Sequence, residues 1–244
     1  MKLSILIPVY NEEKTIIEVL KQLMCLKFPC KREIIVIDDG STDGTRKRLK
    51  NYESSLFTNK TRTDNIKVIY HKNNRGKGAA IQSGLTLVSG DYILIQDADS
   101  EYLPVEIPKL LSPLFNHQYK HSNCSLAIYG SRFKNNKAII PPFYLFGNKL
   151  LTMITNLLYN TELTDMETGY KLLPAKVFKR MNLKSDRFDI EPEITAKLIR
   201  NKIKIMEVPI SYRGRTHLAG KKLTIADAFE AIKSLVIWRF KSVS

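Results

Sequence analysis

The sequence predicts an α/β protein in which a single, mostly parallel sheet is flanked by helices. Across the first hundred residues, short apolar runs alternate with longer stretches whose apolar residues recur at helical spacing. That alternation is typical of a parallel sheet covered by helices. Acidic or glycine-rich segments follow the runs, and the chain of 244 residues contains no internal repeat, low-complexity segment or linker. We therefore expect one domain spanning residues 1–244.

The expected strands of the first half are short and apolar, as buried parallel strands are. They cover residues 3–7, 33–37, 66–70 and 92–95. Helices are expected at residues 11–23, 42–52 and 81–88. Asn11 is a suitable N-cap for the first helix, because acidic residues follow it in the first turn.

The second half is less regular. Strands are expected at residues 125–129 and 203–212, the latter at a sheet edge because Pro209 cannot donate a backbone hydrogen bond. Helices are expected at residues 104–114, 143–159, 174–181, 193–201 and 223–240. The helix at 143–159 either packs in the core or lies at a membrane interface. A basic loop at 213–222 precedes the amphipathic C-terminal helix, a combination suited to a membrane surface.

Composition limits the partners. The net charge of +15 favours an anionic partner: a nucleotide, a nucleic acid or an anionic membrane. No zinc-finger, RNP or helix-turn-helix pattern is present, so we expect no nucleic acid. The three cysteines form neither a CxxC pair nor an even-numbered disulfide framework, which favours a reducing, cytoplasmic location. We expect neither a signal peptide nor a spanning helix, because the first apolar run is short and no apolar stretch is long enough to cross a bilayer.

The expected strand at 92–95 leads directly into Asp97 and Asp99. Ligands of open α/β sheets bind just beyond the carboxyl ends of such strands. Side chains two residues apart in an extended backbone point the same way, and paired carboxylates suit a hard cation that also holds phosphate oxygens. The sequence therefore indicates a Mg²⁺ or Mn²⁺ site, with a solvated acidic turn as the alternative.

A glycine-containing loop at residues 71–80 precedes another expected helix. Small residues let the backbone approach an anion, the helix start offers free N–H groups, and Lys77 adds charge. The spacing matches neither a P-loop nor a Rossmann fingerprint. We interpret the loop as a phosphate contact, with a plain glycine loop as the alternative.

A polar turn at residues 164–171 contains Asp165 and a second carboxylate. One of them could serve as a catalytic base, although Asp165 would equally well cap a helix.

Five motifs in order resemble the family 2 glycosyltransferases of GT-A fold, which have a Rossmann-like sheet. They are Pro8-Val9-Tyr10-Asn11-Glu12, Asp38-Asp39-Gly40-Ser41-Thr42-Asp43, Asn74-Arg75-Gly76-Lys77-Gly78-Ala79, Asp97-Ala98-Asp99 and Gly130-Ser131-Arg132. Later segments, Glu191-Pro192-Glu193 and Gly214-Arg215-Thr216, are most similar to the polyprenyl-phosphate branch, which includes dolichyl-phosphate mannose synthase and glucosyltransferase.

The resemblance implies an inverting, metal-dependent transfer of a hexose from GDP-mannose or UDP-glucose to a polyprenyl or dolichyl phosphate. Residues 1–100 would bind the nucleotide sugar, and residues 101–244 would bind the acceptor at the cytoplasmic face of a membrane. By position, the base and ribose pocket would contain Pro8, Tyr10, Glu12, Asp39 and Lys77. The metal would be held by Asp97, Asp99 and Glu101. Basic positions facing phosphate would be Arg132 and Arg215, and Asp165 falls near a family base.

Other functions are less well supported. A family 2 enzyme acting on a hydroxyl of a glycan, glycoprotein or glycolipid fits the same motifs. A sugar-nucleotide pyrophosphorylase would need a glycine-rich loop after the first strand, which the sequence lacks. A basic nucleic-acid-binding protein has only the net charge in its favour.

Overall fold

The computed structural model describes residues 1–58, 65–116, 125–134, 138–215 and 224–241. Most of the basic loop expected at 213–222 lies outside the described residues. The helices are α1 (Ile16–Cys25), α2 (Thr45–Thr58), α3 (Lys77–Leu85), η1 (Pro104–Glu106), α4 (Ile107–Phe115), α6 (Pro142–Tyr159), α7 (Ala175–Arg180), α8 (Ile190–Arg200) and α9 (Ile225–Phe240).

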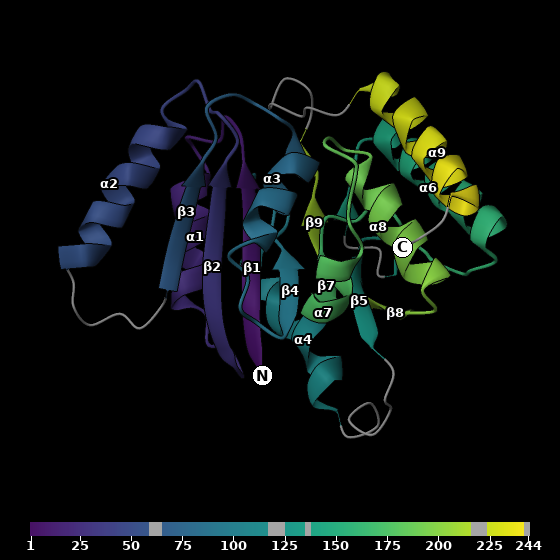
Figure 1. Cartoon of the computed structure of the whole chain (residues 1–244), viewed down its shortest axis with the longest axis horizontal. Coiled ribbons are helices and arrows are strands. Elements are labelled where there is room, and N and C mark those ends of the chain that lie inside the picture. The colour runs from purple at the N-terminus through teal and green to yellow at the C-terminus, as the bar shows by residue number, and fades with distance from the viewer. Residues whose placement is uncertain (59–64, 117–124, 135–137, 216–223, 242–244) are drawn as a thin grey trace.

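A central sheet has the strand order β3-β2-β1-β4-β7-β5-β8 (Figure 1). Its strands are β1 (Lys2–Val9), β2 (Lys31–Asp38), β3 (Asn65–Tyr70), β4 (Tyr92–Ile95), β5 (Leu126–Ser131), β7 (Lys171–Pro174) and β8 (Lys204–Pro209). Within it, β7 runs antiparallel to both of its neighbours, while every other pairing is parallel. The predicted mostly parallel sheet is therefore confirmed, and β8 lies at an edge as Pro209 indicates. Two short strands, β6 (Ala138–Ile139) and β9 (Tyr212–Arg213), pair separately.

Alternating side chains of the sheet enter two different cores, one on each face. In β1, Ile5 and Ile7 join the core that contains the buried stripe of α1, whereas Leu6 joins the core packed under α3, α7 and α8. In β2, Ile34 and Ile35 divide between the same two cores. This arrangement explains why the strands read as continuous apolar runs: both faces of each strand are buried.

The sequence analysis missed β7. It treated residues 164–171 as a polar turn and expected a helix from 174, but the structure has a fully buried four-residue strand, β7, followed by α7. Four residues are too few to show a strand periodicity. The strand forms because it completes hydrogen bonding between β4 and β5, a long-range requirement invisible in the local sequence.

Three strand ends, those of β1, β2 and β4, meet at one edge of the sheet. Since β1 pairs with both β2 and β4 in parallel, the segments that follow these strands emerge side by side. Asn11, expected to cap the first helix, has a left-handed backbone (φ 52°), and its side-chain oxygen accepts hydrogen bonds from Thr42 and Asp43 instead. It therefore ties two of these loops together.

The helices α6 and α9 lie beside one another on the outside of α8 (Figure 1). A third core joins them, and the Tyr159 hydroxyl of α6 donates a hydrogen bond to the Leu235 carbonyl of α9 at 2.7 Å. Among the described helices, none combines the length and apolar character needed to cross a bilayer.

Candidate active site

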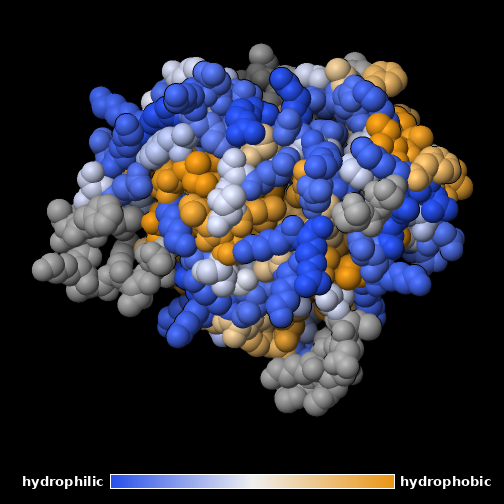
Figure 2. Space-filling view, in the orientation of Figure 1, coloured by the Kyte–Doolittle hydropathy of each residue, from blue (hydrophilic) through white to orange (hydrophobic). Residues whose placement is uncertain are grey.

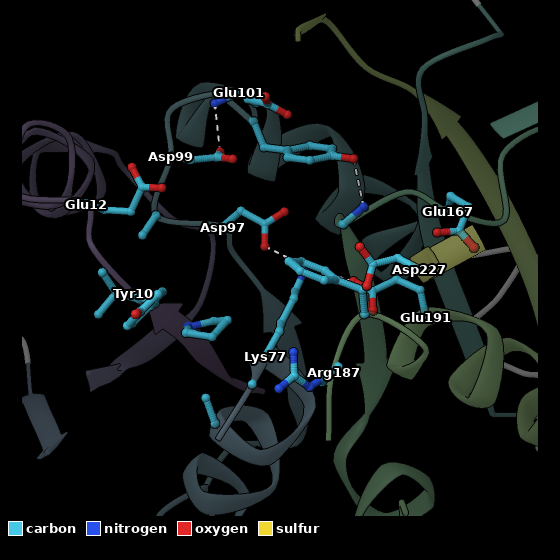
Figure 3. A pocket seen from close by; sticks show the side chains of 18 of the residues that line it. Tyr10, Glu12, Lys77, Asp97, Asp99, Glu101, Glu167, Arg187, Glu191 and Asp227 are labelled. Atoms are coloured by element: carbon cyan, nitrogen blue, oxygen red, sulfur yellow. Dashed lines mark hydrogen bonds and ion pairs between the residues drawn. The ribbon is translucent and has the colours of Figure 1, made fainter. Parts of the chain in front are cut away.

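A cavity of about 410 Å³ opens at the carboxyl edge of the sheet, and its size is ordinary for a small-molecule site. Residues from strand ends β1, β2 and β4 line it together with residues from α3, α6, α8 and the segment after β9. Figure 3 shows Tyr10 and Glu12 on one side, Asp97 and Asp99 in the middle, and Glu167 and Glu191 on the other. The fold thus brings carboxylates that are far apart in sequence into one cavity.

Asp97 and Asp99 are positioned by the turn that ends β4. Gln96 is fully buried; its side-chain amide donates to the carbonyl oxygens of Asp97 and Tyr102, which fixes the turn. Asp99 accepts a hydrogen bond from the backbone N–H of Glu101 at 3.0 Å. Both aspartates line the cavity, as the sequence indicates.

Lys77, the first residue of α3, connects the two sides of the cavity. Its ammonium lies 2.7 Å from Asp97 Oδ1 and 2.7 Å from Glu191 Oε1. Burial lowers the pKa of Lys77, but the two carboxylates raise it by more, so the lysine stays charged. The preceding Gly76 has a φ of +101°, and because it has no β-carbon this loop can pack closely against the Asp186 carbonyl.

Arg215 forms ion pairs with acidic side chains on the side of the cavity away from Lys77. One guanidinium nitrogen lies 3.1 Å from Glu12 Oε1 and 2.8 Å from Asp99 Oδ2. Burial and the negative charges of the two neighbouring acids raise the pKa of Asp99 to about 7, an effect that Arg215 opposes. A region this acidic is suited to bind additional positive charge.

Glu101, predicted as a third metal ligand, is held by hydrogen bonds from the segment around β9. Its carboxylate accepts hydrogen bonds from the Tyr212 hydroxyl and, at 2.7 Å, from the Arg215 backbone N–H. Within the described residues, no group of three or more His, Cys, Asp or Glu side chains is arranged to hold a metal. The role of Glu101 as a metal ligand stays a prediction, and these contacts are what a metal at this position would compete with.

Asp97 and Asp99 remain a suitable pair for a divalent cation. Their oxygen ligands are hard, and the raised pKa of Asp99 indicates negative charge that a cation would relieve. Mg²⁺ is commonly held by one or two carboxylates together with phosphate oxygens of the substrate. Two aspartates and a diphosphate therefore fit Mg²⁺ or Mn²⁺.

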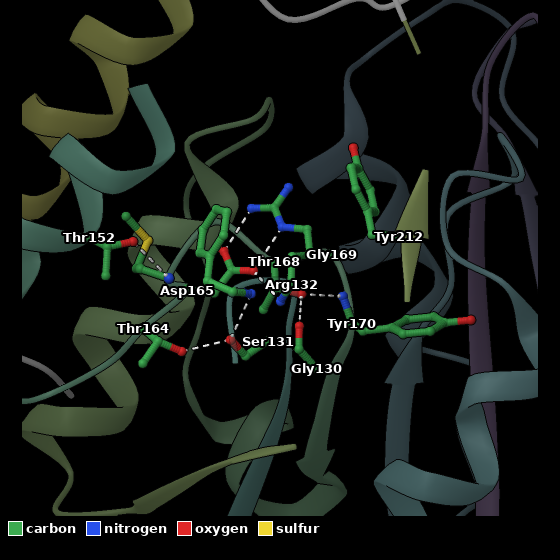
Figure 4. A network of polar contacts seen from close by, with 12 residues as sticks. Gly130, Ser131, Arg132, Thr152, Thr164, Asp165, Thr168, Gly169, Tyr170 and Tyr212 are labelled. Atoms are coloured by element: carbon green, nitrogen blue, oxygen red, sulfur yellow. Dashed lines mark hydrogen bonds and ion pairs between the residues drawn. The ribbon is translucent and has the colours of Figure 1, made fainter. Parts of the chain in front are cut away.

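Arg132 and Asp165 form a buried pair beside the cavity (Figure 4). Arg132 Nε donates to Asp165 Oδ2 at 2.7 Å, and a terminal nitrogen donates to Oδ1, also at 2.7 Å. Arg132 lines the cavity, whereas Asp165 is completely buried. Because both of its oxygens accept hydrogen bonds from Arg132, Asp165 is suited to orient the Arg132 guanidinium rather than to abstract a proton.

The residues expected to bind the nucleotide lie together in the same cavity. Pro8, Tyr10 and Asp39 line the cavity next to the glycine-containing loop. The buried Asp39 carboxylate accepts hydrogen bonds from the backbone N–H groups of Arg75 and Gly76. It therefore shapes the loop that carries Lys77.

Three further carboxylates line the cavity, and the sequence analysis gave none of them an individual role: Glu167, Glu191 and Asp227. Glu191 lies in the first turn of α8, where an acid is explained by the helix dipole alone. Glu167 lies in the turn before β7 and is the second carboxylate of the polar turn in which the sequence analysis placed a possible catalytic base. Burial and the charge of Glu191 raise the pKa of Glu167 to about 7. A raised pKa in a cleft is a functional signal that only tertiary structure provides.

A mostly parallel sheet with an aspartate pair at its carboxyl edge, flanked by Lys77 and Arg215, defines a GT-A glycosyltransferase. The family model for glycosyl transferase family 2 matches residues 4–181, so the chain belongs to that family.

Curated relatives make the family assignment more specific. The dolichyl-phosphate β-glucosyltransferase of Saccharomyces cerevisiae is 30% identical, covering 97% of this chain and 74% of the yeast protein. The dolichol-phosphate mannosyltransferase of Pyrococcus furiosus is 30% identical, and the match covers 98% of this chain and 64% of the Pyrococcus enzyme. The Methanococcus voltae UDP-N-acetylglucosamine–dolichyl-phosphate N-acetylglucosaminyltransferase is 31% identical over 84% of this chain and 83% of that enzyme.

The fold is also found in solved structures. Glucosyl-3-phosphoglycerate synthase of Mycobacterium tuberculosis, in complex with Mn²⁺, UDP and phosphoglyceric acid, superposes with a TM-score of 0.69. Identity is 18%, and the match covers 100% of this chain and 80% of that one. The same enzyme with Mg²⁺ and UDP gives a TM-score of 0.66. This likeness shows the GT-A fold.

Proposed function

We propose that this glycosyltransferase moves a hexose from GDP-mannose or UDP-glucose to a polyprenyl or dolichyl phosphate, with inversion, at a membrane surface. Residues 1–100 provide most of the nucleotide and diphosphate contacts, and residues 101–244 bind the acceptor. The names of the relatives support a lipid-phosphate acceptor, and the aspartate pair supports dependence on Mg²⁺ or Mn²⁺.

The chemistry follows from the charged groups of the cavity. Mg²⁺ or Mn²⁺ held by Asp97 and Asp99 would supply positive charge to the diphosphate leaving group. Lys77 and Arg215 add fixed cations at the same place. Arg132, immobilised by Asp165, orients the acceptor phosphate, whose oxygen attacks the anomeric carbon opposite the leaving group. A phosphate is already anionic at neutral pH, so the transfer needs positioning more than it needs a general base.

The observation that carries the lipid acceptor is an apolar face of α6 that starts at the cavity. Tyr144 and Asn148 line the cavity from the first turns of this helix. Large apolar side chains, 37% to 84% exposed, recur every three or four residues along the α6 face: Phe143, Phe146, Leu150, Met153 and Leu157. The neighbouring helix exposes Phe229, Val236, Ile237 and Phe240, and Figure 2 shows hydrophobic residues gathered over these two helices.

This apolar face has basic neighbours. Exposed cations on α6, on α9 and just after it are Lys149, Lys233, Arg239 and Lys241. A helix face of this kind binds at the boundary between headgroups and acyl chains of an anionic bilayer. It would bring the cavity mouth to the surface in which a polyprenyl phosphate is anchored.

Sugar transfer into an organic-extractable product tests the proposal. Labelled GDP-mannose and UDP-glucose are incubated in parallel with the protein, polyprenyl phosphate and Mn²⁺. We expect label in the organic phase from one donor, and loss of that label with EDTA or with Asp99→Asn. Asp91→Asn serves as the matched control because Asp91 is exposed at the start of β4.

Two results would contradict the proposal. Transfer that persists in EDTA excludes metal dependence. Label that appears only on a water-soluble glycan or glycoprotein acceptor replaces the lipid phosphate with a hydroxyl.

A further inference from the structure

Two buried oxygen atoms of the cavity have no hydrogen-bond partner among the described residues: Glu167 Oε1 and Glu191 Oε2. Both side chains line the cavity, and Glu191 is only 4% exposed. A buried acceptor left unpaired destabilises a protein, so native structures rarely keep one without a reason. Two such atoms in one cavity indicate a ligand that supplies the missing donors.

The two carboxyl groups lie on the side of the cavity opposite the expected nucleotide pocket (Figure 3). Glu191 is fixed by Lys77, and the same ammonium bonds Asp97 on the diphosphate side. A nucleotide sugar is linear: base, ribose, diphosphate and hexose follow in that order. If the base lies at Tyr10 and the diphosphate at Asp97, the hexose reaches Glu191 and Glu167.

The missing ligand group is a neutral hydrogen-bond donor rather than a cation. Positive charge already faces these carboxyl groups, because Lys77 pairs with Glu191 and the buried Lys171 ammonium acts on both. The described residues also contain no cluster of three ligands for a second metal ion. What the two oxygen atoms lack is an O–H or N–H, and a hexose offers several hydroxyls.

We propose that Glu167 and Glu191 bind hydroxyl groups of the hexose being transferred and thereby select the donor sugar. This inference rests on the proposed function and specifies its donor side. Glu167 and Glu191 would hold the sugar while Lys77 holds the diphosphate, so the bond to be broken lies between two fixed regions. A donor that lacks the contacted hydroxyl would leave the carboxyl oxygens unpaired and bind more weakly.

Calorimetric titration in the presence of Mn²⁺ tests this division. The ligands are UDP, GDP, UDP-glucose, GDP-mannose and the 2-, 3-, 4- and 6-deoxy forms of the donor that binds. Because hydrogen bonds to charged groups contribute strongly, we expect Glu167→Ala to weaken nucleotide-sugar binding about tenfold or more. Affinity for the free nucleoside diphosphate should stay within about twofold, since it does not reach Glu167. Glu162→Ala is the control, because Glu162 is exposed on the same segment.

The deoxy donors separate a sugar contact from a structural role. One deoxy form should bind the wild-type protein about tenfold more weakly and should be insensitive to Glu167→Ala, because the contact is already absent. Glu167→Gln keeps the volume of the side chain and guards against a folding defect. The inference is refuted if both Glu167 variants weaken UDP or GDP as much as the nucleotide sugar, or weaken neither. If no nucleotide sugar binds the wild-type protein, the proposed function itself fails.

Discussion

Gly169 allows Asp97 to occupy its position at the cavity, which makes Gly169→Ala an informative substitution. A β-carbon on residue 169 would lie closer than 3.0 Å to Asp97 Oδ2 and 3.0 Å from the Tyr102 ring. Real β-carbons essentially never approach other atoms so closely. Tyr102 is buried in the core, so its ring has no free space into which it could move. Asp97 would have to retreat by about 1 Å, and a displacement of that size in an active site can lower the rate about a hundredfold.

The predicted result is therefore a loss of about a hundredfold in kcat/KM for sugar transfer. We expect overpacking to lower the free energy of unfolding by about 1–3 kcal/mol, measured by urea denaturation. The retreat of Asp97 should also raise the Mn²⁺ concentration needed for half-maximal activity.

The matched control is Gly147→Ala in α6, where an added β-carbon meets nothing within 4 Å. It should keep full activity and raise helix stability by roughly 0.5–1 kcal/mol. Wild-type kcat/KM and Mn²⁺ dependence in Gly169→Ala would refute the assignment of Asp97 to the reaction centre.

Three further predictions concern other parts of the molecule. Asp165→Asn should lower the free energy of unfolding by about 3–5 kcal/mol, because it leaves the Arg132 guanidinium buried without its charged partner; urea denaturation that matches wild type would contradict this. The pKa of Glu167 rises from 4.5 to about 7 on folding, so the unfolded state loses this proton at lower pH than the folded state. The free energy of unfolding should therefore decrease as the pH rises from 4.5 to about 7. Glu167→Gln should flatten that fall in thermal denaturation followed across the same range, and an unchanged slope would exclude Glu167 as its source. Phe146→Ser should weaken binding to phosphatidylserine vesicles about tenfold in flotation assays, since burying a Phe contributes about 1.5–3 kcal/mol; Val105→Ser, exposed elsewhere, should not.

The first half of the fold could be predicted because both faces of its strands are buried. A run such as Ile34–Ile37 leaves no polar residue for solvent, so the sequence itself indicates a parallel strand between helix layers. The convergence of Asp97 with Tyr10 and Asp39 follows from the same reasoning, because parallel strands share a carboxyl edge.

The site could be predicted only where its residues follow strand ends or belong to a recognisable motif. Lys77 was identified from its glycine-containing loop, Arg132 and Arg215 were identified by resemblance, and the cavity brings all three together. Glu167 and Glu191 belong to segments that the sequence analysis singled out, but neither was given a binding role, because each has an adequate local explanation as a turn or helix-start residue. The hydrogen-bond partner of Glu101 could not be predicted for a related reason: Tyr212 is over a hundred residues away in sequence.

The sequence alone therefore determined the α/β class, the parallel direction of the first strands, the aspartate pair and the family. These depend on short-range patterns of hydrophobic burial and on motifs of a few residues. Only the tertiary structure decided which charges are paired. Lys77 bridges Asp97 and Glu191, Arg215 joins Glu12 to Asp99, and Asp165 is committed to Arg132. Electrostatic and hydrogen-bond partners are set by distances of a few ångströms between segments remote in the chain, and packing alone fixes those distances.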